Sequence, residues 1–480
     1  LIISAMACSG PQDALLPPPQ ADSQTVSQDG GVPLDALSSD AAPELKIISI
    51  KAQPSAKVST VIEVEWETTI PATGHVEFGL AKGQYSMSTP TTKDASLKHR
   101  ALLLGVAAET AVHLRVVAIP QGSVVQVHAE HQTKTGTLPA SLPKMTLTNH
   151  DKASSAGGYT VVPVHSLSNS WLTILDDQGR YIWFFKLEAQ VPTAHVSMDR
   201  QAVIFMGDSF NTSEAIRRVS FDGRTETQTQ VPGIHTDFVE IAPKKYAALG
   251  WEVKTYENGK RHLLSDTIIE VDDGRTPKKV WSMLEHYTPD LTVKDYGGKG
   301  IYPKEPNAED WAHGNGLHFD AKEDAYYLTA SGPGAGLEAV IKVSRSTGKV
   351  LWTLGGPYNS LDTGTDMTLV DTPHSVQTTA DSVLIFNRRY KKAGACSDAV
   401  EVTIDETGQK ATRKWSYASP ACYQCYFLGN ADRLWNGNTL INWSTSGRLD
   451  EVNTNKNMVW SLSVDLGAGF GFVHRVKSLY

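Results

Sequence analysis

One phrase recurs six times from residue 142 onward, and it constrains the fold more than any other feature of this chain. It has an apolar strand-like start, a turn containing Asp, Gly or Asn, and a second apolar run that usually ends in Trp. Such a pattern predicts a β-hairpin. The six instances are Ile174–Trp183, Val219–Val231 (which lacks the Trp), Ile268–Trp281, Val340–Trp352, Ala399–Trp415 and Leu449–Trp460.

Further strand-like runs lie between the hairpins, so that each repeat holds four strands. They include Ala202–Met206, Tyr246–Gly250, Tyr326–Ala330, Val383–Asn387 and Thr439–Trp443. Four-stranded units that recur at intervals of tens of residues are typical of β-propeller blades. We therefore expect an all-β fold with a six-bladed β-propeller over residues 140–480. The alternative is one or two β-sandwiches whose turns are alike by coincidence.

The segment before the repeats also has a strand pattern. Residues 61–67, with the sequence VIEVEWE, alternate apolar and polar side chains, as half-buried strands do. Shorter runs separated by Gly, Pro and Ser continue to residue 139. We expect residues 45–139 to form a β-sandwich, and the phrase HVEFGLAKGQY resembles a fibronectin type III-like module. No catalytic cluster stands out in this segment, which favours a spacer or a lid.

The first residues resemble an export signal followed by a tether. The run LIISAMAC at residues 1–8 is similar to the end of a bacterial lipoprotein signal, with Cys8 as the lipidated residue. Residues 9–44 are rich in Pro, Ser, Asp and Gly, a composition that favours a disordered linker. We therefore expect an exported protein, periplasmic or anchored to the outer membrane as a lipoprotein. The alternative is an ordinary apolar segment with a free Cys8.

Charge and cysteine content narrow the class of protein further. The net charge is −8, from 44 basic and 52 acidic residues, which argues against a nucleic-acid partner. No apolar stretch is long enough to cross a membrane, so contact with a membrane would come only through a lipid anchor. Export permits a disulfide between Cys396 and either Cys422 or Cys425. The rival interpretation is a zinc half-site at Cys422-x-x-Cys425, for which no second Cys pair exists.

Four histidines keep a fixed place relative to the repeats. His195, His235, His313 and His374 each follow a hairpin phrase and precede the next strand. In a propeller that strand is the innermost one of the next blade, and its start lies at one mouth of the central channel. The spacing therefore predicts that these imidazoles converge. Such a cluster can supply a nucleophile, a general base or a three-histidine metal site.

The phrases around these histidines resemble the bacterial arylsulfate sulfotransferases. The most specific part is the run 310–315, DWAHGN, and the runs 233–237, GIHTD, and 373–377, PHSVQ, agree with it. The resemblance covers roughly residues 45–480. It implies a six-bladed propeller that moves a sulfuryl group from an aryl sulfate to a phenol. The reaction passes through a sulfated histidine in a ping-pong mechanism, and no cofactor takes part.

Roles follow from the resemblance residue by residue. His374 corresponds to the nucleophile, and His313 and Asn315 correspond to groups that bind the sulfuryl oxygens and assist proton transfer. His235 corresponds to the third histidine, near the leaving or accepting oxygen. Two alternatives stay open. One is a non-catalytic propeller lipoprotein that binds a sulfated or anionic ligand at the channel mouth, and the other is a three-histidine metal hydrolase.

One position departs from the family pattern. The family places an Arg at the end of the strand that follows His-x-Asn, and this chain has Ser331 there. Either Arg388 or Arg389, at the end of the corresponding strand after His374, reaches the site instead, or the activity is altered. A solvated strand end is the simpler interpretation of that Arg pair.

Aromatic residues near the same mouth predict a wall for a phenolic ring. Trp251, Trp311 and Tyr390 are the substrate-binding candidates, together with Arg388. Tyr423, Tyr426, Trp443 and Phe470 lie in later repeats, and the propeller core is the alternative place for about half of these rings. The insertion Glu285–Glu309 is expected to be a lid or a disordered loop.

Overall fold

The computed structural model describes residues 44–122, 126–166, 169–207, 214–332, 334, 336–465 and 467–480. Residues Leu45–Tyr480 belong to one compact unit. The predicted lipidation site Cys8 and almost all of the predicted linker lie outside the described residues, and both stay predictions. No helix in the described part of the chain has the length and apolar character needed to span a membrane.

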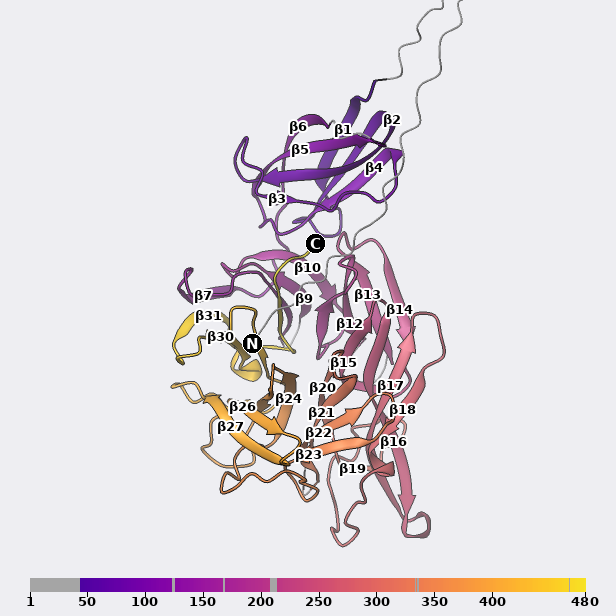
Figure 1. Cartoon of the computed structure of the whole chain (residues 1–480), viewed down its shortest axis with the longest axis vertical. Helices are drawn as coiled ribbons and strands as arrows, with labels where there is room; N and C mark the ends of the chain where they lie inside the picture. The colour runs from indigo at the N-terminus through magenta and orange to yellow at the C-terminus, as the bar shows by residue number, and fades with distance from the viewer. Residues whose placement is uncertain are drawn as a thin grey trace, which may run out of the picture. The chain divides into compact units, whose positions relative to one another are not determined.

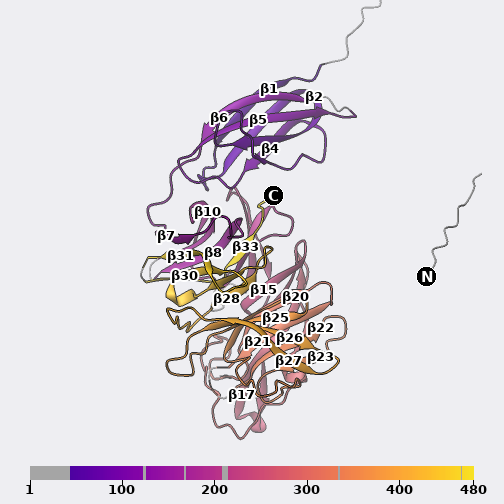
Figure 2. The same cartoon turned by 60° about the vertical axis from the view of Figure 1, so that its left-hand side comes forward.

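The first six strands form one sheet. They are β1 (Ile47–Pro54), β2 (Ile62–Gly79), β3 (Met87–Ser88), β4 (Ser96–Leu103), β5 (Ala111–Pro120) and β6 (Val127–Lys134). The sheet is continuous because β2 pairs with β1 and β4 through its first half and with β3 and β5 through its second half. Figure 2 shows β1, β2, β4, β5 and β6 side by side.

The core of this sheet contains side chains from both halves of β2. Val64 and Trp66 from the first half cluster with Val76 and Phe78 from the second half and with Leu114 of β5. The alternation of buried and exposed residues expected for residues 61–67 is seen from Val64 to Glu67, whereas residues 61–64, including Glu63, are all buried. The structure shows one sheet rather than two separate ones, and the fibronectin-like β-sandwich stays a prediction.

Six further sheets follow among the described residues, and we call them blades 1 to 6 (Figure 1). Blade 1 contains β8 (Tyr159–Ser166), β9 (Ser170–Leu175), β10 (Tyr181–Leu187), β32 (Ala468–Phe470) and β33 (His474–Val476), and blade 2 contains β11 (Ala194–Val196), β12 (Ala202–Met206), β13 (Ala215–Ser220) and β14 (Glu226–Gln230). Blade 3 contains β15 (Ile234–Ala242), β16 (Lys245–Tyr256), β17 (Arg261–Asp272), β18 (Lys278–Ser282) and β19 (Glu309–Asp310).

The other three blades repeat the same order. Blade 4 contains β20 (Gly314–Asp320), β21 (Ala325–Ser331), β22 (Glu338–Ser344) and β23 (Val350–Leu354), and blade 5 contains β24 (Pro373–Thr378), β25 (Ser382–Asn387), β26 (Asp398–Asp405) and β27 (Lys410–Tyr417). Blade 6 contains β28 (Asn430–Arg433), β29 (Thr439–Asn442), β30 (Arg448–Val452), β31 (Met458–Val464) and β7 (Met145–His150). Three 3₁₀ helices are described, η1 (Glu257–Gly259), η2 (Met283–Glu285) and η3 (Ser444–Ser446).

The six repeated phrases form the outer hairpins of the six blades, as predicted. They pair as β9–β10, β13–β14, β17–β18, β22–β23, β26–β27 and β30–β31. The strand after each hairpin begins the next blade, except that β19 follows β18 and pairs with β17 of blade 3. Neighbouring first strands such as β15, β20 and β24 lie against one another. The result is a propeller-like ring of six sheets.

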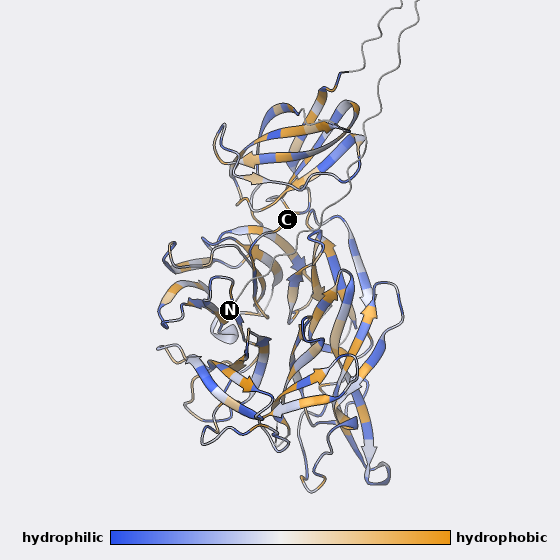
Figure 3. Ribbon diagram, viewed as in Figure 1, coloured by the Kyte–Doolittle hydropathy of each residue, from blue (hydrophilic) through white to orange (hydrophobic). Residues whose placement is uncertain are grey.

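Three of the recurring Trp residues link neighbouring blades. The indole N–H of Trp183 donates to the carbonyl of Phe221 in the hairpin turn of blade 2. Trp352 donates to the side-chain carboxylate of Glu406 in the turn of blade 5, and Trp460 donates to the carbonyl of Asp177 in the turn of blade 1. A large buried ring with one N–H donor suits this contact, because it packs in the core and satisfies a turn at once. Figure 3 shows the apolar residues concentrated along the strands.

The ring is closed by strands from both ends of its sequence. The late strands β32 and β33 pair with β8, so they complete the inner edge of blade 1. The early strand β7 pairs with β31 and adds a fifth strand to blade 6. Asn430 of β28 also donates to the carbonyl of Val473, which joins blade 6 to the inner edge of blade 1.

Candidate active site

The candidate histidines sit where the first strands of blades 3, 4 and 5 are irregular. The β-ladder register shifts between Ile234 and Phe238 in β15, between Gly314 and Gly316 in β20, and between Pro373 and Ser375 in β24. A β-bulge of this kind re-aims the side chain of the extra residue. The extra residues include His235 in β15, Asn315 in β20 and His374 in β24.

The backbone at these three places adopts a left-handed conformation. The φ angle is +53° at Thr236, +49° at His313 and +48° at Thr372. Positive φ is uncommon for any residue with a side chain and is a marked outlier for β-branched Thr. Strained residues of this kind gather at functional sites, because the surrounding structure must hold them. The sharp turn lies next to a candidate catalytic side chain in each blade.

These side chains meet at one cavity with a volume of about 520 Å³. It is lined by His165, Gln190, Pro192, His235, Thr236, Trp251, Ile301, His313, Asn315, His374, Arg388, Phe427, Leu428, Ser444, Thr445, Gly467, Ala468, Gly469 and Phe470. The structure therefore brings His235, His313, Asn315, His374 and Arg388 together, although they come from three blades. No carboxylate appears among the described lining residues, so the wall suits an anionic ligand.

His374 is buried and has no carboxylate partner. It is 2% exposed, and its Nδ1 atom has no hydrogen-bond partner among the described residues. Burial, followed by the positive charges of Arg388 and His313, lowers the pKa of His374 well below its ordinary value. Its imidazole is therefore neutral near neutral pH and keeps a lone pair for attack on an electrophile.

His313 has the opposite electrostatic character. Its Nδ1 atom is hydrogen bonded to the carboxylate of Asp310, which is fully buried. Burial lowers the pKa of His313, but the charge and the hydrogen bond of Asp310 outweigh burial, and the net effect raises the pKa above its ordinary value. His313 therefore stays protonated at a higher pH than His374. Asn315 donates from Nδ2 to the carbonyl of His313 at 2.9 Å.

His235 is held between a ring and a carboxylate. Its imidazole stacks on Trp251 with ring centroids 4.4 Å apart and an interplanar angle of 22°. Its Nδ1 atom lies 3.0 Å from the hydroxyl of Thr236. Its Nε2 atom lies 3.1 Å from Oδ1 of Asp266, and both side chains are 1% exposed. The stacking and the Thr236 contact hold the ring of His235, whereas its Nε2 atom has no hydrogen-bond partner among the described residues.

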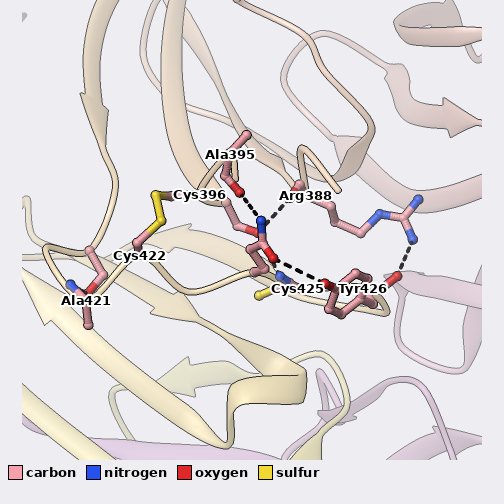
Figure 4. Close-up of a disulfide and its surroundings, with 10 residues drawn as sticks. Arg388, Ala395, Cys396, Ala421, Cys422, Cys425 and Tyr426 are labelled. Atoms are coloured by element: carbon pink, nitrogen blue, oxygen red, sulfur yellow. Dashed lines mark hydrogen bonds between the residues drawn. A yellow bond between two sulfur atoms is a disulfide. The ribbon is translucent and has the colours of Figure 1, made fainter. Parts of the chain in front are cut away.

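Arg388 supplies the guanidinium of the cavity. It is 5% exposed, and burial lowers its pKa to about 10. Its Nη1 atom donates to the carbonyl of Tyr426, and the side chain extends toward that carbonyl in Figure 4. Its Nη2 atom donates to the hydroxyl of Ser331 at 3.4 Å. No carboxylate pairs with it in the described part of the chain, and its Nε–H has no partner there.

Arg389 does not take part in the cavity. Its guanidinium pairs with the carboxylates of Asp398 and Asp371 and donates to the carbonyl of Thr368. Of the two arginines considered from the sequence, Arg388 is therefore the one that reaches the cavity. The interpretation as a solvated strand end fits neither arginine, because the Arg389 side chain is 12% exposed and paired with two carboxylates.

A disulfide supports the loop next to Arg388. Cys396 is bonded to Cys422, and Cys425 is a buried free thiol (Figure 4). This pairing is one of the two considered from the sequence, and it leaves no zinc half-site at Cys422 and Cys425. The Ser397 hydroxyl donates to the carbonyl of Arg388 and accepts from the backbone N–H of Cys425. The loop continues into Phe427 and Leu428, which line the cavity.

The other predicted residues lie in several places. Trp251 lines the cavity, whereas Trp311 packs in the core of blades 3 and 4 with Trp281 and Leu328 and does not line it. Tyr390 does not line it either, and its ring lies under the guanidinium of Arg388 at 4.8 Å. His195 stacks on His474 at 4.3 Å, away from the cavity lining.

The insertion Glu285–Glu309 is ordered and packed. Tyr296 is 1% exposed, and Glu309 forms a buried ion pair with Arg261. Ile301 from this insertion lines the cavity. The segment therefore forms part of the wall, and the disordered alternative is wrong for it.

Two ionisable residues of the site were missed in the sequence. Asp266 lies in β17 between the buried residues Ser265 and Thr267, and the rare placement of a charge in a buried strand was the available signal. His165 in β8 lines the cavity from blade 1. Its Nε2 atom lies 2.7 Å from the carbonyl of Val191, and burial lowers its pKa to about 4. It follows no repeated phrase, whereas each of the predicted histidines does.

The described residues contain no group of three or more His, Cys, Asp or Glu arranged to hold a metal ion. The three histidines of the cavity are oriented by Asp310, by Asp266 and by packing, rather than toward one common point of coordination. The chemistry open to the site is that of a neutral nucleophilic imidazole, an imidazolium acid and a buried guanidinium around an anion.

One comparison with known proteins identifies a family. The family model for arylsulfotransferase (ASST) matches residues 140–465. No curated protein sequence matches the chain. Among solved structures, a protein of unknown function from Bacteroides caccae is 13% identical, with a TM-score of 0.39 and coverage of 67% of this chain and 100% of that one.

Two further solved structures are similarly distant. An inactive virginiamycin B lyase from Staphylococcus aureus, with quinupristin, is 10% identical, with a TM-score of 0.33 and coverage of 69% and 99% of the two chains. A calcium-binding protein, regucalcin, from Agrobacterium tumefaciens is 10% identical, with a TM-score of 0.34 and coverage of 56% and 73%. These scores are too low to support any inference about activity. The family match covers more than half of the chain and includes every histidine of the cavity, so the chain belongs to the arylsulfotransferase family.

Proposed function

We propose that this protein transfers a sulfuryl group from an aryl sulfate to a phenol through a sulfohistidine at His374. The observation that carries the proposal is one cavity that contains a neutral buried imidazole, a protonated imidazole and an unpaired guanidinium. Membership of the arylsulfotransferase family supports the reaction class. The ping-pong course and the site of the intermediate are the finer parts of the proposal.

In the first half-reaction, a nitrogen of His374 attacks the sulfur of the donor. A nitrogen–sulfur bond forms, and the bond between sulfur and the aryl oxygen breaks with both electrons on oxygen. The leaving phenolate takes a proton from the imidazolium of His313, whose raised pKa keeps that proton available. Neutral His374 needs no base, because its lowered pKa leaves its lone pair free.

Charge on the sulfuryl oxygens is met by fixed donors. The Nε–H of Arg388 has no protein partner among the described residues, and Asn315 keeps the second N–H of its amide. Donors that are already in place when charge develops lower the barrier without reorganisation. The buried guanidinium also gains its missing counter-ion when the sulfate binds.

In the second half-reaction, the oxygen of an acceptor phenol attacks the sulfur. The nitrogen–sulfur bond breaks, and the electron pair returns to His374. The phenol proton goes to His313, which is left neutral by the first half-reaction, so acid and base roles alternate on one residue. Trp251, Phe427 and Phe470 supply the apolar wall against which either ring can lie.

The test uses donor alone and then donor with acceptor. Purified protein is incubated with 4-methylumbelliferyl sulfate, and the peptide that contains His374 is examined by mass spectrometry at alkaline pH, where sulfohistidine survives. We expect the mass of one SO₃ group on that peptide and its loss when phenol is added. Saturable binding of the aryl sulfate without an SO₃ adduct on the protein points instead to the non-catalytic binding protein.

Two variants control this experiment. His374→Ala is expected to lower kcat by about ten-thousand-fold, as loss of a nucleophile does. His131→Asn changes an exposed histidine of β6 and is expected to leave the rate unchanged. Equal rates for His374→Ala and the wild type would contradict the proposed nucleophile.

We also propose that the protein is exported and that Cys8 carries the lipid. The Cys396–Cys422 disulfide supports export, because cytoplasmic thiols are kept reduced. Labelled palmitate should enter the wild-type protein and not Cys8→Ala, and the protein should fractionate with the cell envelope. Equal labelling of both proteins would exclude this anchor.

A further inference from the structure

Asp266 is a buried carboxylate that touches the backbone of the site. It lies in the middle of β17 and is fully buried. Its Oδ1 atom accepts the backbone N–H of Gly314 at 2.7 Å. No Lys or Arg pairs with it among the described residues, and its Oδ2 atom has no hydrogen-bond partner there. A carboxylate kept in this state costs stability, so its retention calls for a function.

The contact with Gly314 is close because the chain has no side chain there. A Cβ atom added at Gly314 would lie 2.5 Å from Oδ1 of Asp266. Gly314 stands between His313 and Asn315, so this one hydrogen bond holds the backbone between two residues of the cavity. It also joins β17 of blade 3 to the start of β20 in blade 4.

The same oxygen faces the third histidine. Nε2 of His235 lies 3.1 Å from Oδ1 of Asp266. The contact is electrostatic, because Nε2 has no hydrogen-bond partner among the described residues. The hydroxyl of Thr236 lies 3.0 Å from Nδ1 and holds the other side of the ring.

We propose that Asp266 is a positioning residue that sets the orientation of His235 and the placement of His313 and Asn315. One carboxylate oxygen thus locks the catalytic edges of two blades to each other. The expected effect of Asp266 on the reaction rate rests on the proposed sulfuryl transfer. Its expected effect on the positions of His235 and His313 is independent of that function.

Asp266 also acts on His313 through its charge. The groups that face His313 are Asp310 from β19, Asp266 from β17, Arg388 after β25 and His374 from β24. The two carboxylates raise the pKa of His313, and Arg388 opposes them. Removal of the charge at Asp266 therefore moves the titration of His313 to lower pH.

The test compares Asp266→Asn with Asp176→Asn. Asp176 is also a buried carboxylate that accepts backbone N–H groups, but it lies in the outer hairpin turn of blade 1. Proteins with ¹³C-labelled histidine are titrated by NMR, and His313→Gln assigns the signal. We expect the His313 midpoint to fall in Asp266→Asn and to stay in place in Asp176→Asn. An unchanged midpoint in both variants overturns the inference, whether or not the protein is a transferase.

The kinetic arm separates positioning from general damage to the fold. Asp266→Asn is expected to lower kcat for donor cleavage by about 10- to 100-fold with little change in KM, since misplaced groups fail mainly in the transition state. The loss should be smaller when His235→Ala is already present, because part of the effect passes through that ring. The positioning role is contradicted if Asp266→Asn lowers kcat equally in the wild-type and His235→Ala backgrounds and Asp176→Asn lowers kcat as well. No transfer by the wild type refutes the proposed function, and the titration still decides on Asp266.

Discussion

Nη2 of Arg388 lies 3.4 Å from the hydroxyl oxygen of Ser331, across the boundary between blades 5 and 4. Ser331 ends β21, at the place where the sequence resemblance implies an Arg. The guanidinium that reaches this place comes from Arg388, which follows β25 in the neighbouring blade. Arg388 therefore supplies a positive charge at the cavity.

Exchange of these two residues tests whether the site requires the charge rather than the blade that carries it. Arg388→Ser should lower kcat/KM for an aryl sulfate by about 100- to 1000-fold, because a fixed donor to the sulfuryl oxygens is lost. Adding Ser331→Arg to this variant should restore part of the rate. The measurement is initial release of 4-methylumbelliferone at low donor concentration. Arg389→Ser is the control, and a rate loss as large as that of Arg388→Ser would argue against the assignment.

The pairing of Asp310 with His313 predicts the alkaline limb of the rate profile. His313 must be protonated to act on the leaving phenolate, so donor cleavage falls as pH rises through its raised pKa. Asp310→Asn removes the partner that raises this pKa, and the limb should move to lower pH. Rates of donor cleavage across about pH 5 to 10 decide this. If the alkaline limb stays at the same pH in Asp310→Asn, a group other than His313 is responsible for it.

Loss of the Cys396–Cys422 disulfide should affect both stability and the cavity wall. The bond joins residues 26 positions apart, and its removal is expected to cost about 2–4 kcal/mol of unfolding free energy. KM for bulky phenols should also rise, because the same loop carries Phe427 and Leu428. Urea denaturation and acceptor kinetics of Cys396→Ser measure the two effects. Cys425 is a free thiol whose pKa is raised to about 12 by burial. Because Cys425 is not part of the disulfide, Cys425→Ser serves as a control that keeps the disulfide.

A buried ion pair near the closure of the ring should be critical for stability. Arg475 of β33 pairs with Glu451 of β30, and the two side chains are 1% and 0% exposed. Glu451→Gln leaves the guanidinium buried without a counter-charge, which should cost about 3–5 kcal/mol. The midpoint of denaturant unfolding measures this cost. A loss below about 1 kcal/mol, the range of exposed pairs, would show that water reaches Arg475.

The repeated hairpins could be predicted because their signals are local. Turn residues, alternation and a terminal Trp lie within about a dozen residues of one another in phrases such as Ile174–Trp183. The positions of His235, His313 and His374 relative to the repeats could be predicted for the same reason, since each follows a hairpin. Their convergence then follows from the closed ring and needs no knowledge of side-chain direction.

Side-chain direction next to a bulge could not be predicted. Trp311 and His313 are two residues apart, which in a regular strand would place them on one face. The backbone N–H of Trp311 donates to Leu264, and its carbonyl accepts from Leu337, so its ring enters the core. His313 then turns toward the cavity through its left-handed φ. Asp266 was not identified from the sequence because the rest of β17 has the pattern of an ordinary buried strand.

The closure of blade 1 by β32 and β33 has a consequence for truncated chains. A chain that lacks residues 468–476 has one unpaired edge at β8, and such an edge invites contact with other chains. Gly467, Ala468, Gly469 and Phe470 also line the cavity, so the same chain has an incomplete cavity wall. Loss of these few residues therefore exposes a sheet edge and opens the cavity at once.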